Sequence, residues 1–147
     1  EFHSFGGQGY IDVTFRTNSP YAYRPKEEVV IDATNASKTK IIIGDEFMAE
    51  AAYPIVDIKR TGVTDGVLKI HKQNNESDYI SFENLSSNSI RLFTKQGIIK
   101  DMDNGEFLYH RKNKSSGDKW IEILPGENPV TLSKGWKATL KYQVVIY

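Results

Sequence analysis

The sequence of 147 residues contains no cysteine. Disulfide bonds, thiolate nucleophiles and cysteine-rich zinc sites are therefore excluded. A chain of this length does not need such cross-links, because folding buries about 68–70% of the unfolded surface of a domain of this size. We expect residues 1–147 to form a single domain.

An excess of either charge is missing as well, since 19 acidic residues balance 19 basic ones. A general nucleic-acid or anionic-membrane partner needs a positive field, so neither is predicted. No apolar run approaches the roughly 18 residues of a membrane-spanning helix, so no membrane insertion is predicted.

Catalytic motifs are also lacking. No serine lies in a nucleophile elbow, and no glycine-rich phosphate loop precedes a helix. The three histidines, His3, His71 and His110, have no metal-ligand spacing. No motif pairs two carboxylates as a glycosidase would require, so the acidic residues of the predicted strands are interpreted as part of a solvent-exposed face. We therefore predict no enzyme, no cofactor and no metal site.

What the sequence does contain is β-forming patterning. Aromatic residues make up 12% of the chain, and about ten short segments rich in Val, Ile and Thr are separated by Asn, Ser, Gly and Asp. Strands at intervals of 8–12 residues indicate a β-sandwich or barrel. Residues 45–52 have helical spacing for about two turns, with a loop as the alternative.

The C-terminal segment 135–147 shows the longest alternation. Its even positions are apolar and predict one long, half-buried strand with neighbours on both edges. The apolar residues on this parity are Trp136, Ala138, Leu140, Tyr142, Val144 and Ile146.

The N-terminal segment is interpreted as a flexible arm (1–9) followed by an alternating strand (10–17). The apolar or small residues at odd positions of that strand continue backwards into the arm, so the whole segment predicts one extended strand. This strand either pairs with a partner as a donor strand or is the first strand of an ordinary sandwich. Its members are Phe5, Gly7, Gly9, Ile11, Val13 and Phe15. Whether it pairs within its own chain or with a neighbour is left open.

Three further local predictions can be made. The three consecutive isoleucines 41–43 indicate burial on both faces of a strand. Asp65-Gly66 suits a hairpin between segments 55–60 and 67–72, and Asp103-Asn104-Gly105 suits a hairpin that joins segment 98–102 to segment 106–111.

With these two ends, the chain resembles the cysteine-free subunits of chaperone–usher fimbriae. Those pilins are immunoglobulin-like β-sandwiches that lack a final strand, and a neighbour donates an alternating N-terminal strand into the groove beside the C-terminal strand. Gly135 and Tyr147 have the twelve-residue spacing of the family's C-terminal motif. The resemblance implies a donor strand in the N-terminal segment and an acceptor strand formed by Trp136, Leu140, Tyr142, Val144 and Ile146.

The resemblance also implies a function. It suggests a structural or adhesive subunit, a pilin or a minor or tip pilin, secreted to the bacterial cell surface. Its partners would be neighbouring subunits and a periplasmic chaperone, bound by β-strand addition, and a host glycan or protein receptor.

A carbohydrate-binding β-sandwich, or lectin-like module, is the alternative function. Exposed aromatic rings can stack on the apolar face of a sugar. The candidates are Tyr21, Tyr23, Tyr53, Tyr109 and Trp120, of which we select Tyr109 and Trp120 as ligand-binding residues. A viral or phage structural jelly roll is a further alternative.

Overall fold

The computed structural model describes residues 2–5, 8–11, 14, 21–72, 79–112 and 120–147. Within these ranges every strand pairing is antiparallel, and the helical structure is a single 3₁₀ turn, η1 (Tyr109–Arg111). The predicted all-β class is therefore confirmed.

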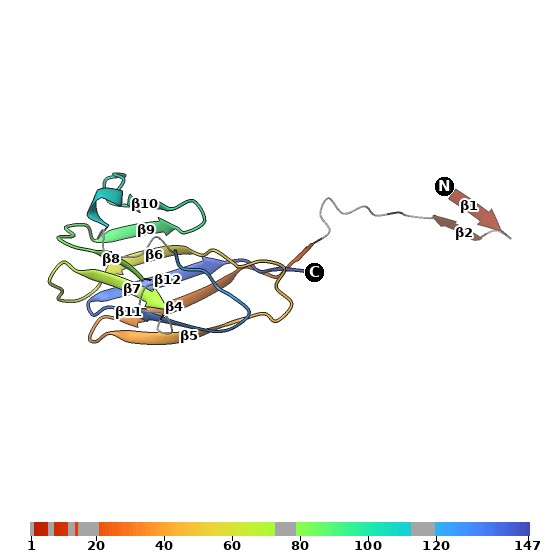
Figure 1. Cartoon of the computed structure of the whole chain (residues 1–147). Helices are drawn as coiled ribbons and strands as arrows, with labels where there is room; N and C mark the ends of the chain where they lie inside the picture. Colours follow the sequence, from red (N-terminus) through yellow and green to blue (C-terminus); the bar gives the residue numbers. More distant parts are fainter. Residues whose placement is uncertain (1, 6–7, 12–13, 15–20, 73–78, 113–119) are drawn as a thin grey trace.

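Two main sheets form a sandwich (Figure 1). The five-stranded sheet has the order β10 (Ile98–Asp101), β9 (Ser89–Phe93), β6 (Ile55–Arg60), β12 (Trp136–Tyr142) and β4 (Glu27–Ala33). The four-stranded sheet has the order β5 (Lys38–Gly44), β11 (Gly126–Leu132), β7 (Leu68–Lys72) and β8 (Tyr79–Phe82). Two small sheets pair β13 (Val145–Ile146) with β3 (Ala22–Tyr23), and β1 (Phe2–Phe5) with β2 (Gln8–Ile11).

The core lies between the main sheets and is built by the alternation of each strand. Trp136, Ala138, Leu140, Tyr142 and Val144 are all buried, as their shared parity predicts. The largest of them, Trp136, donates its indole N–H to the carbonyl of Val67 at 3.0 Å. This bond satisfies the polar atom that the buried ring carries.

Both edges of β12 are occupied by strands of its own domain. β4 pairs with it from Trp136 to Tyr142, and β6 pairs with it from Trp136 to Lys141. The strand does have neighbours on both edges, as we predicted, but the open groove that a donated strand would fill beside it is not there. The acceptor residues Trp136, Leu140 and Tyr142 instead face the core of the sandwich.

The predicted single strand 135–147 is interrupted after Tyr142. β13 resumes two residues later and pairs with β3 instead of a main sheet. The backbone N–H of Arg24 donates to the carbonyl of Val144 at 2.9 Å, so the tail has a different partner from β12. Val144 nevertheless stays buried, and Ile146 packs against the core.

The N-terminal segment forms a hairpin rather than one extended donor strand. β1 and β2 pair in a register that sets Phe5 opposite Gln8 and Phe2 opposite Ile11. Phe5 therefore lies on a different strand from Gly9 and Ile11. Gly7, Val13 and Phe15 lie outside the described residues.

Two local predictions are wrong, because the sequence does not show which sheet a strand joins or which of its faces is covered. Asp65-Gly66 does not close a hairpin, because β6 and β7 lie in different sheets. The isoleucines of β5 are not buried on both faces: Ile42 is 3% exposed, but Ile41 and Ile43 are 54% and 64% exposed. In a two-layer antiparallel sandwich one face of each sheet packs on the core, and no described element covers the outer face of β5, so Ile41 and Ile43 stay exposed to solvent.

The predicted turn at Asp103–Gly105 is present, but the hairpin strand expected over residues 106–111 is not: this segment has an isolated bridge between Phe107 and Lys100 and then forms η1. Gly105 has φ of +80°, and the returning chain bonds to β10 through the N–H of Leu108 and the carbonyl of Ile99 at 3.0 Å. Residues 45–52 form no helix. They cross between the sheets, with isolated bridges at Met48 and Ala52, so the loop alternative holds there.

Candidate functional site

A cleft of about 410 Å³ opens at the end of the five-stranded sheet where β12 finishes and β6 begins. This volume lies within the range of small-molecule sites. The lining of the cleft comes from segments that are far apart in sequence. The strand β12 runs towards the end of the sandwich where the C-terminus lies (Figure 1). The lining residues of the cleft are Lys26, Glu50, Ala51, Ala52, Tyr53, Ile55, Lys95, Lys141, Tyr142, Gln143 and Val145.

Tyr53 supplies the aromatic surface of the cleft. Its side chain is 42% exposed, and Ala52 beside it is held in place by an isolated bridge to Ile123. The carboxylate of Glu122 lies close enough to raise the pKa of the Tyr53 hydroxyl, with smaller contributions from burial, from a hydrogen bond to Glu122 and from the charge of Glu50. The hydroxyl is thus tied to a carboxylate while the ring stays accessible.

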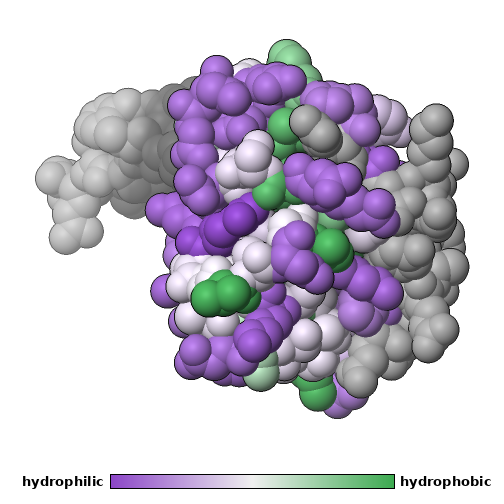
Figure 2. All heavy atoms as spheres, turned by 90° about the vertical axis from the view of Figure 1, so that its left-hand side faces the viewer, coloured by the Kyte–Doolittle hydropathy of each residue, from purple (hydrophilic) through white to green (hydrophobic). Residues whose placement is uncertain are grey.

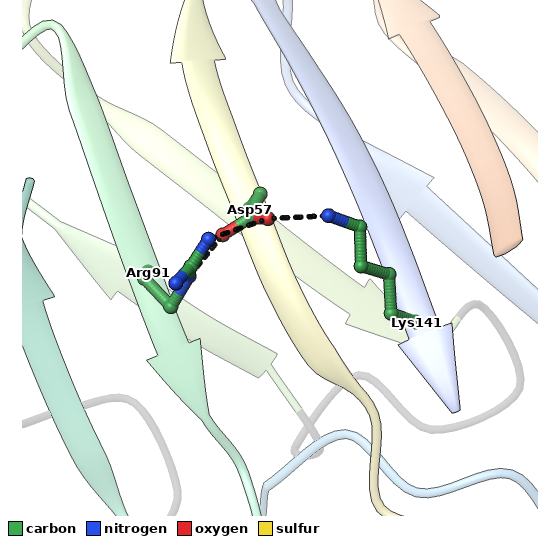
Figure 3. Close-up of polar contacts among 3 residues, drawn as sticks. All are labelled: Asp57, Arg91 and Lys141. Atoms are coloured by element: carbon green, nitrogen blue, oxygen red, sulfur yellow. Dashed lines mark hydrogen bonds and ion pairs between the residues drawn. The ribbon is translucent and has the colours of Figure 1, made fainter. Parts of the chain in front are cut away.

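Lys141 reaches the cleft from β12 and is positioned by Asp57 of β6, as Figure 3 shows. The carboxylate of Asp57 accepts a hydrogen bond from Lys141 Nζ at 3.1 Å and two from Arg91 of β9, at 2.5 and 3.0 Å. Burial alone would raise the pKa of Asp57, but the hydrogen bonds and charges of Arg91 and Lys141 outweigh burial and lower it.

The polar groups of the cleft differ in how much hydrogen-bonding capacity remains for a ligand. Gln143 donates its amide Nε2 to the carbonyl of Arg24 at 2.9 Å, and the hydroxyl of Tyr142 donates to Glu27 at 2.8 Å. Burial and Glu27 both raise the pKa of Tyr142, so it stays a neutral donor. The amide oxygen of Gln143 and the ammonium groups of Lys26 and Lys95 remain able to bond to a ligand.

Chemically, the cleft offers an aromatic ring and short apolar side chains, with three lysines and one glutamate around them. An apolar surface combined with a few convergent polar groups is the usual composition of a ligand site. The opposite end of the sandwich differs, because its surface is mainly hydrophilic with separated apolar spots (Figure 2). The cleft is therefore the part of the described surface best suited to a small ligand.

The selected ligand candidates do not line this cleft. Trp120 is half-buried and packs against the core. Tyr109 is exposed on η1, where the ammonium of Lys112 lies 6.0 Å from its ring centre. Tyr21 packs edge-on against Tyr147 at 5.9 Å. Of the five aromatic candidates from sequence, only Tyr53 is among the lining residues.

Sequence analysis missed the lysines and the glutamine of the cleft. Lys26, Lys95, Lys141 and Gln143 belong to four separate positions that no local motif connects. The parity of Lys141 and Gln143, opposite to the core-facing residues of β12, indicated that both side chains point outward.

Neither metal coordination nor a membrane-spanning helix is found in the described ranges. His71 lies on β7 and His110 on η1, and the described residues contain no cluster of three or more metal-ligating side chains. None of their helices is long and apolar enough to cross a membrane.

The fold and the cleft together define an antiparallel β-sandwich with a binding-type cleft at one end. No protein-family model matches the sequence, and no curated protein matches it. Among solved structures, it is similar to the Dit protein (gp 19.1) of phage SPP1, described as a paradigm of the hub adsorption apparatus in phages that infect Gram-positive bacteria.

The likeness to SPP1 Dit has a TM-score of 0.58 at 10% sequence identity. It covers 86% of this chain and 50% of the Dit chain, so the chain spans half the length of that protein. At this identity the comparison establishes a shared fold.

Proposed function

We propose that this chain is a non-catalytic attachment module that binds an anionic glycan of a cell surface in the cleft around Tyr53. The observation that carries the proposal is the exposed Tyr53 ring, placed among short apolar side chains and within a rim of polar groups. A sugar presents an apolar ring face and a circle of hydroxyl groups, so it complements both parts of such a surface.

The charges of the cleft favour a glycan with negative groups. Lys26, Lys95 and Lys141 outnumber the one lining carboxylate, Glu50. Lys141 is bonded to Asp57, and the carboxylates of Glu122 and Glu27 bond to the hydroxyls of Tyr53 and Tyr142. Lys26 and Lys95 are the ammonium groups that we propose to pair with carboxylates or phosphates of the ligand. The chain as a whole has no net charge, so this preference is local.

Similarity to a protein of a phage adsorption hub supports a role in attachment as part of a larger assembly. In this proposal the sandwich is a module carried by that assembly, and the cleft contributes contact with the host surface. The immunoglobulin-like subclass and the extracellular location remain predictions from sequence.

Binding to a glycan panel tests the proposal. The panel contains neutral, uronic-acid and phosphorylated oligosaccharides, and binding is measured by calorimetry with the wild type, Tyr53→Ala and Tyr109→Ala. Loss of a stacked ring costs about 1.4 kcal/mol, so we expect roughly tenfold weaker binding by Tyr53→Ala. Tyr109→Ala, which removes an exposed tyrosine ring outside the cleft, is expected to bind as the wild type does.

The double variant Lys26→Met and Lys95→Met tests the charge preference. It should weaken binding of the acidic members of the panel and leave any binding of neutral members unchanged. The proposal would be overturned if no glycan class bound, or if Tyr109→Ala abolished binding while Tyr53→Ala had no effect.

The fimbrial subunit is the weaker proposal. Strand donation beside the C-terminal strand requires a free edge there, and β4 and β6 occupy both edges of β12. The extended donor strand is also replaced by the β1–β2 hairpin over the described part of its length.

A further inference from the structure

The outer edge of β5 is a strand edge without a partner in the described part of the chain. β5 pairs with β11 over seven residues, from Lys38 to Gly44, and the sheet order ends with β5. It lies along the border of the sandwich in Figure 1. Such an edge presents a row of backbone N–H and C=O groups with which another strand can pair.

Pro129 determines which residues of β5 direct these groups outward. It lies opposite Ile41, and proline has no N–H to donate. In an antiparallel ladder, pairs that exchange two hydrogen bonds alternate with pairs that exchange none. The Ile41–Pro129 pair is therefore of the second kind, and the backbone groups of Ile41 point away from β11. The same follows for Thr39 and Ile43, two positions away.

The other side of β11 agrees with this assignment. If the pairs with Thr39 and Ile41 exchange no hydrogen bonds, the backbone groups of the odd-numbered residues of β11 and of Ser133 should point towards β7. The N–H of Ser133 does donate to the carbonyl of Lys69, at 2.9 Å. The β11–β7 pairing runs from Leu132 to Val130 and stops before Pro129, which has no N–H to offer there.

The side chains of the same three residues lie on the outer face of the sheet, and two of them, Ile41 and Ile43, are apolar. Ile41 and Ile43 are more than half exposed, whereas Ile42 between them is buried. Thr39 lies on the same outer face, where its hydroxyl hydrogen-bonds to that of Thr131 at 2.7 Å. An unpaired edge flanked by exposed apolar side chains is one to which another strand can add.

We propose that this edge pairs with β5 of a second copy of the chain, antiparallel about a two-fold axis at Ile41. All seven residues then overlap. Ile41 lies opposite Ile41, Thr39 opposite Ile43, Lys40 opposite Ile42, and Lys38 opposite Gly44. No lysine faces a lysine, whereas an axis at Lys40 would place two of them in direct opposition, which is destabilising.

The outward N–H and C=O groups fit the same arrangement. Ile41 and its symmetry mate would exchange two hydrogen bonds, as would Thr39 and Ile43, so every outward group in the centre of the strand finds a partner. Because the chain carries no net charge, two copies do not repel one another at long range.

Single-cysteine variants test the register, because the native chain has no cysteine. A hydrogen-bonded antiparallel pair has Cα atoms about 5.5 Å apart, within the range of a disulfide. Ile41→Cys should form a covalent dimer under mild oxidation. Ile43→Cys, which meets Thr39 of the other copy, should not, and neither should the control Val63→Cys, an exposed apolar position outside β5. The double variant Thr39→Cys and Ile43→Cys should cross-link again.

Sedimentation provides an independent measurement. The average mass of the wild type should rise above its monomer mass of 16.7 kDa as its concentration rises to about 1 mM, where a Kd of about 1 mM places roughly half of the chains in dimers. Ile41→Pro removes an outward N–H and no hydrogen bond to β11, so it should stay folded by circular dichroism and be monomeric. If this variant unfolds, the cysteine series alone decides.

The proposal would be overturned by a wild type that stays monomeric over this range. A folded Ile41→Pro variant that still dimerises, or equal cross-linking of Val63→Cys and Ile41→Cys, would overturn it as well.

Discussion

Asp57 lies between two cationic side chains on the outer face of the five-stranded sheet, and its side chain is 17% exposed. Arg91 holds both carboxylate oxygens, and Lys141 bonds to one of them. Three neighbouring strands are therefore linked by one carboxylate. The arrangement also fixes Lys141 at the entrance of the cleft, so one residue serves both the sheet and the candidate site.

The charge of Asp57 predicts a pH dependence of stability. Its pKa is lower in the folded chain than its ordinary value, so its stabilisation is fully present above the unfolded pKa of about 3.9 and is lost as the pH falls through the folded pKa. At pH 7, Asp57→Asn should lower the free energy of unfolding by about 1–3 kcal/mol.

Urea unfolding of both proteins between pH 7 and pH 2 measures this difference. It should shrink towards the acid end, because protonated Asp57 no longer pairs with Arg91 and Lys141. Glu46→Gln removes an exposed carboxylate and serves as the control. A difference that stays constant down to pH 2 would contradict the role assigned to the charge.

The turn between β11 and β12 joins elements of both sheets. Gly135 accepts hydrogen bonds from the N–H groups of Thr61 and Gly62, at 2.9 and 3.1 Å, and donates its own N–H to the carbonyl of Ala33 at 2.8 Å. Its φ is +92°, and a Cβ there would lie 2.9 Å from the Cβ of Thr64. Both the conformation and the packing therefore require glycine.

Gly135→Ala and Gly126→Ala separate these two requirements. Gly126 also has a positive φ, of +85°, but a Cβ there would meet nothing within 4 Å. We expect Gly126→Ala to lose about 1–2 kcal/mol of stability from backbone strain alone. Gly135→Ala should lose about 1–3 kcal/mol more from overpacking. Equal losses, measured by urea unfolding, would show that the contact with Thr64 relaxes without cost.

At the scale of the whole molecule, the two main sheets enclose the core without the N-terminal hairpin. In the described residues, β1 and β2 pair with each other, and no edge of β12 is left for them. The stability of the sandwich should therefore not depend on this segment.

Deletion of residues 1–11 should shift the melting temperature by less than about 4 °C, which corresponds to about 1 kcal/mol or less for a domain of this size. Thermal unfolding at equal protein concentration measures this shift. A large decrease in melting temperature, reversed by adding a peptide of residues 1–17, would instead favour strand donation and support the fimbrial proposal over the glycan-binding one.

Local alternation predicted much of the fold correctly. The even positions of β12, the short strands at regular intervals and the turn at Asp103–Gly105 follow from side-chain parity and from glycine at positive φ. Each of these features depends on a few residues that are close in the chain, so it could be predicted from the sequence. The same alternation placed Lys141 on the outer face, but it did not indicate what lies beside it.

Sheet membership, by contrast, depends on contacts between residues far apart in the chain. Alternation does not show whether one face of a strand or both are covered, so the exposure of Ile41 and Ile43 was not predictable. Neighbours on both edges of β12 were predicted, but not that β4 and β6 of the same domain supply them. The cleft around Tyr53 arises in the same way, because Lys26, Lys95 and Gln143 meet there only after the sheets have formed.

By itself, the sequence determined that the chain is built from antiparallel strands and which face of most strands is apolar, because side chains alternate with a period of two residues. The tertiary structure alone decided which strands are neighbours, which edge stays open and where a cleft forms. Those outcomes follow from the joint burial of all strands in one core, and no short segment carries that information.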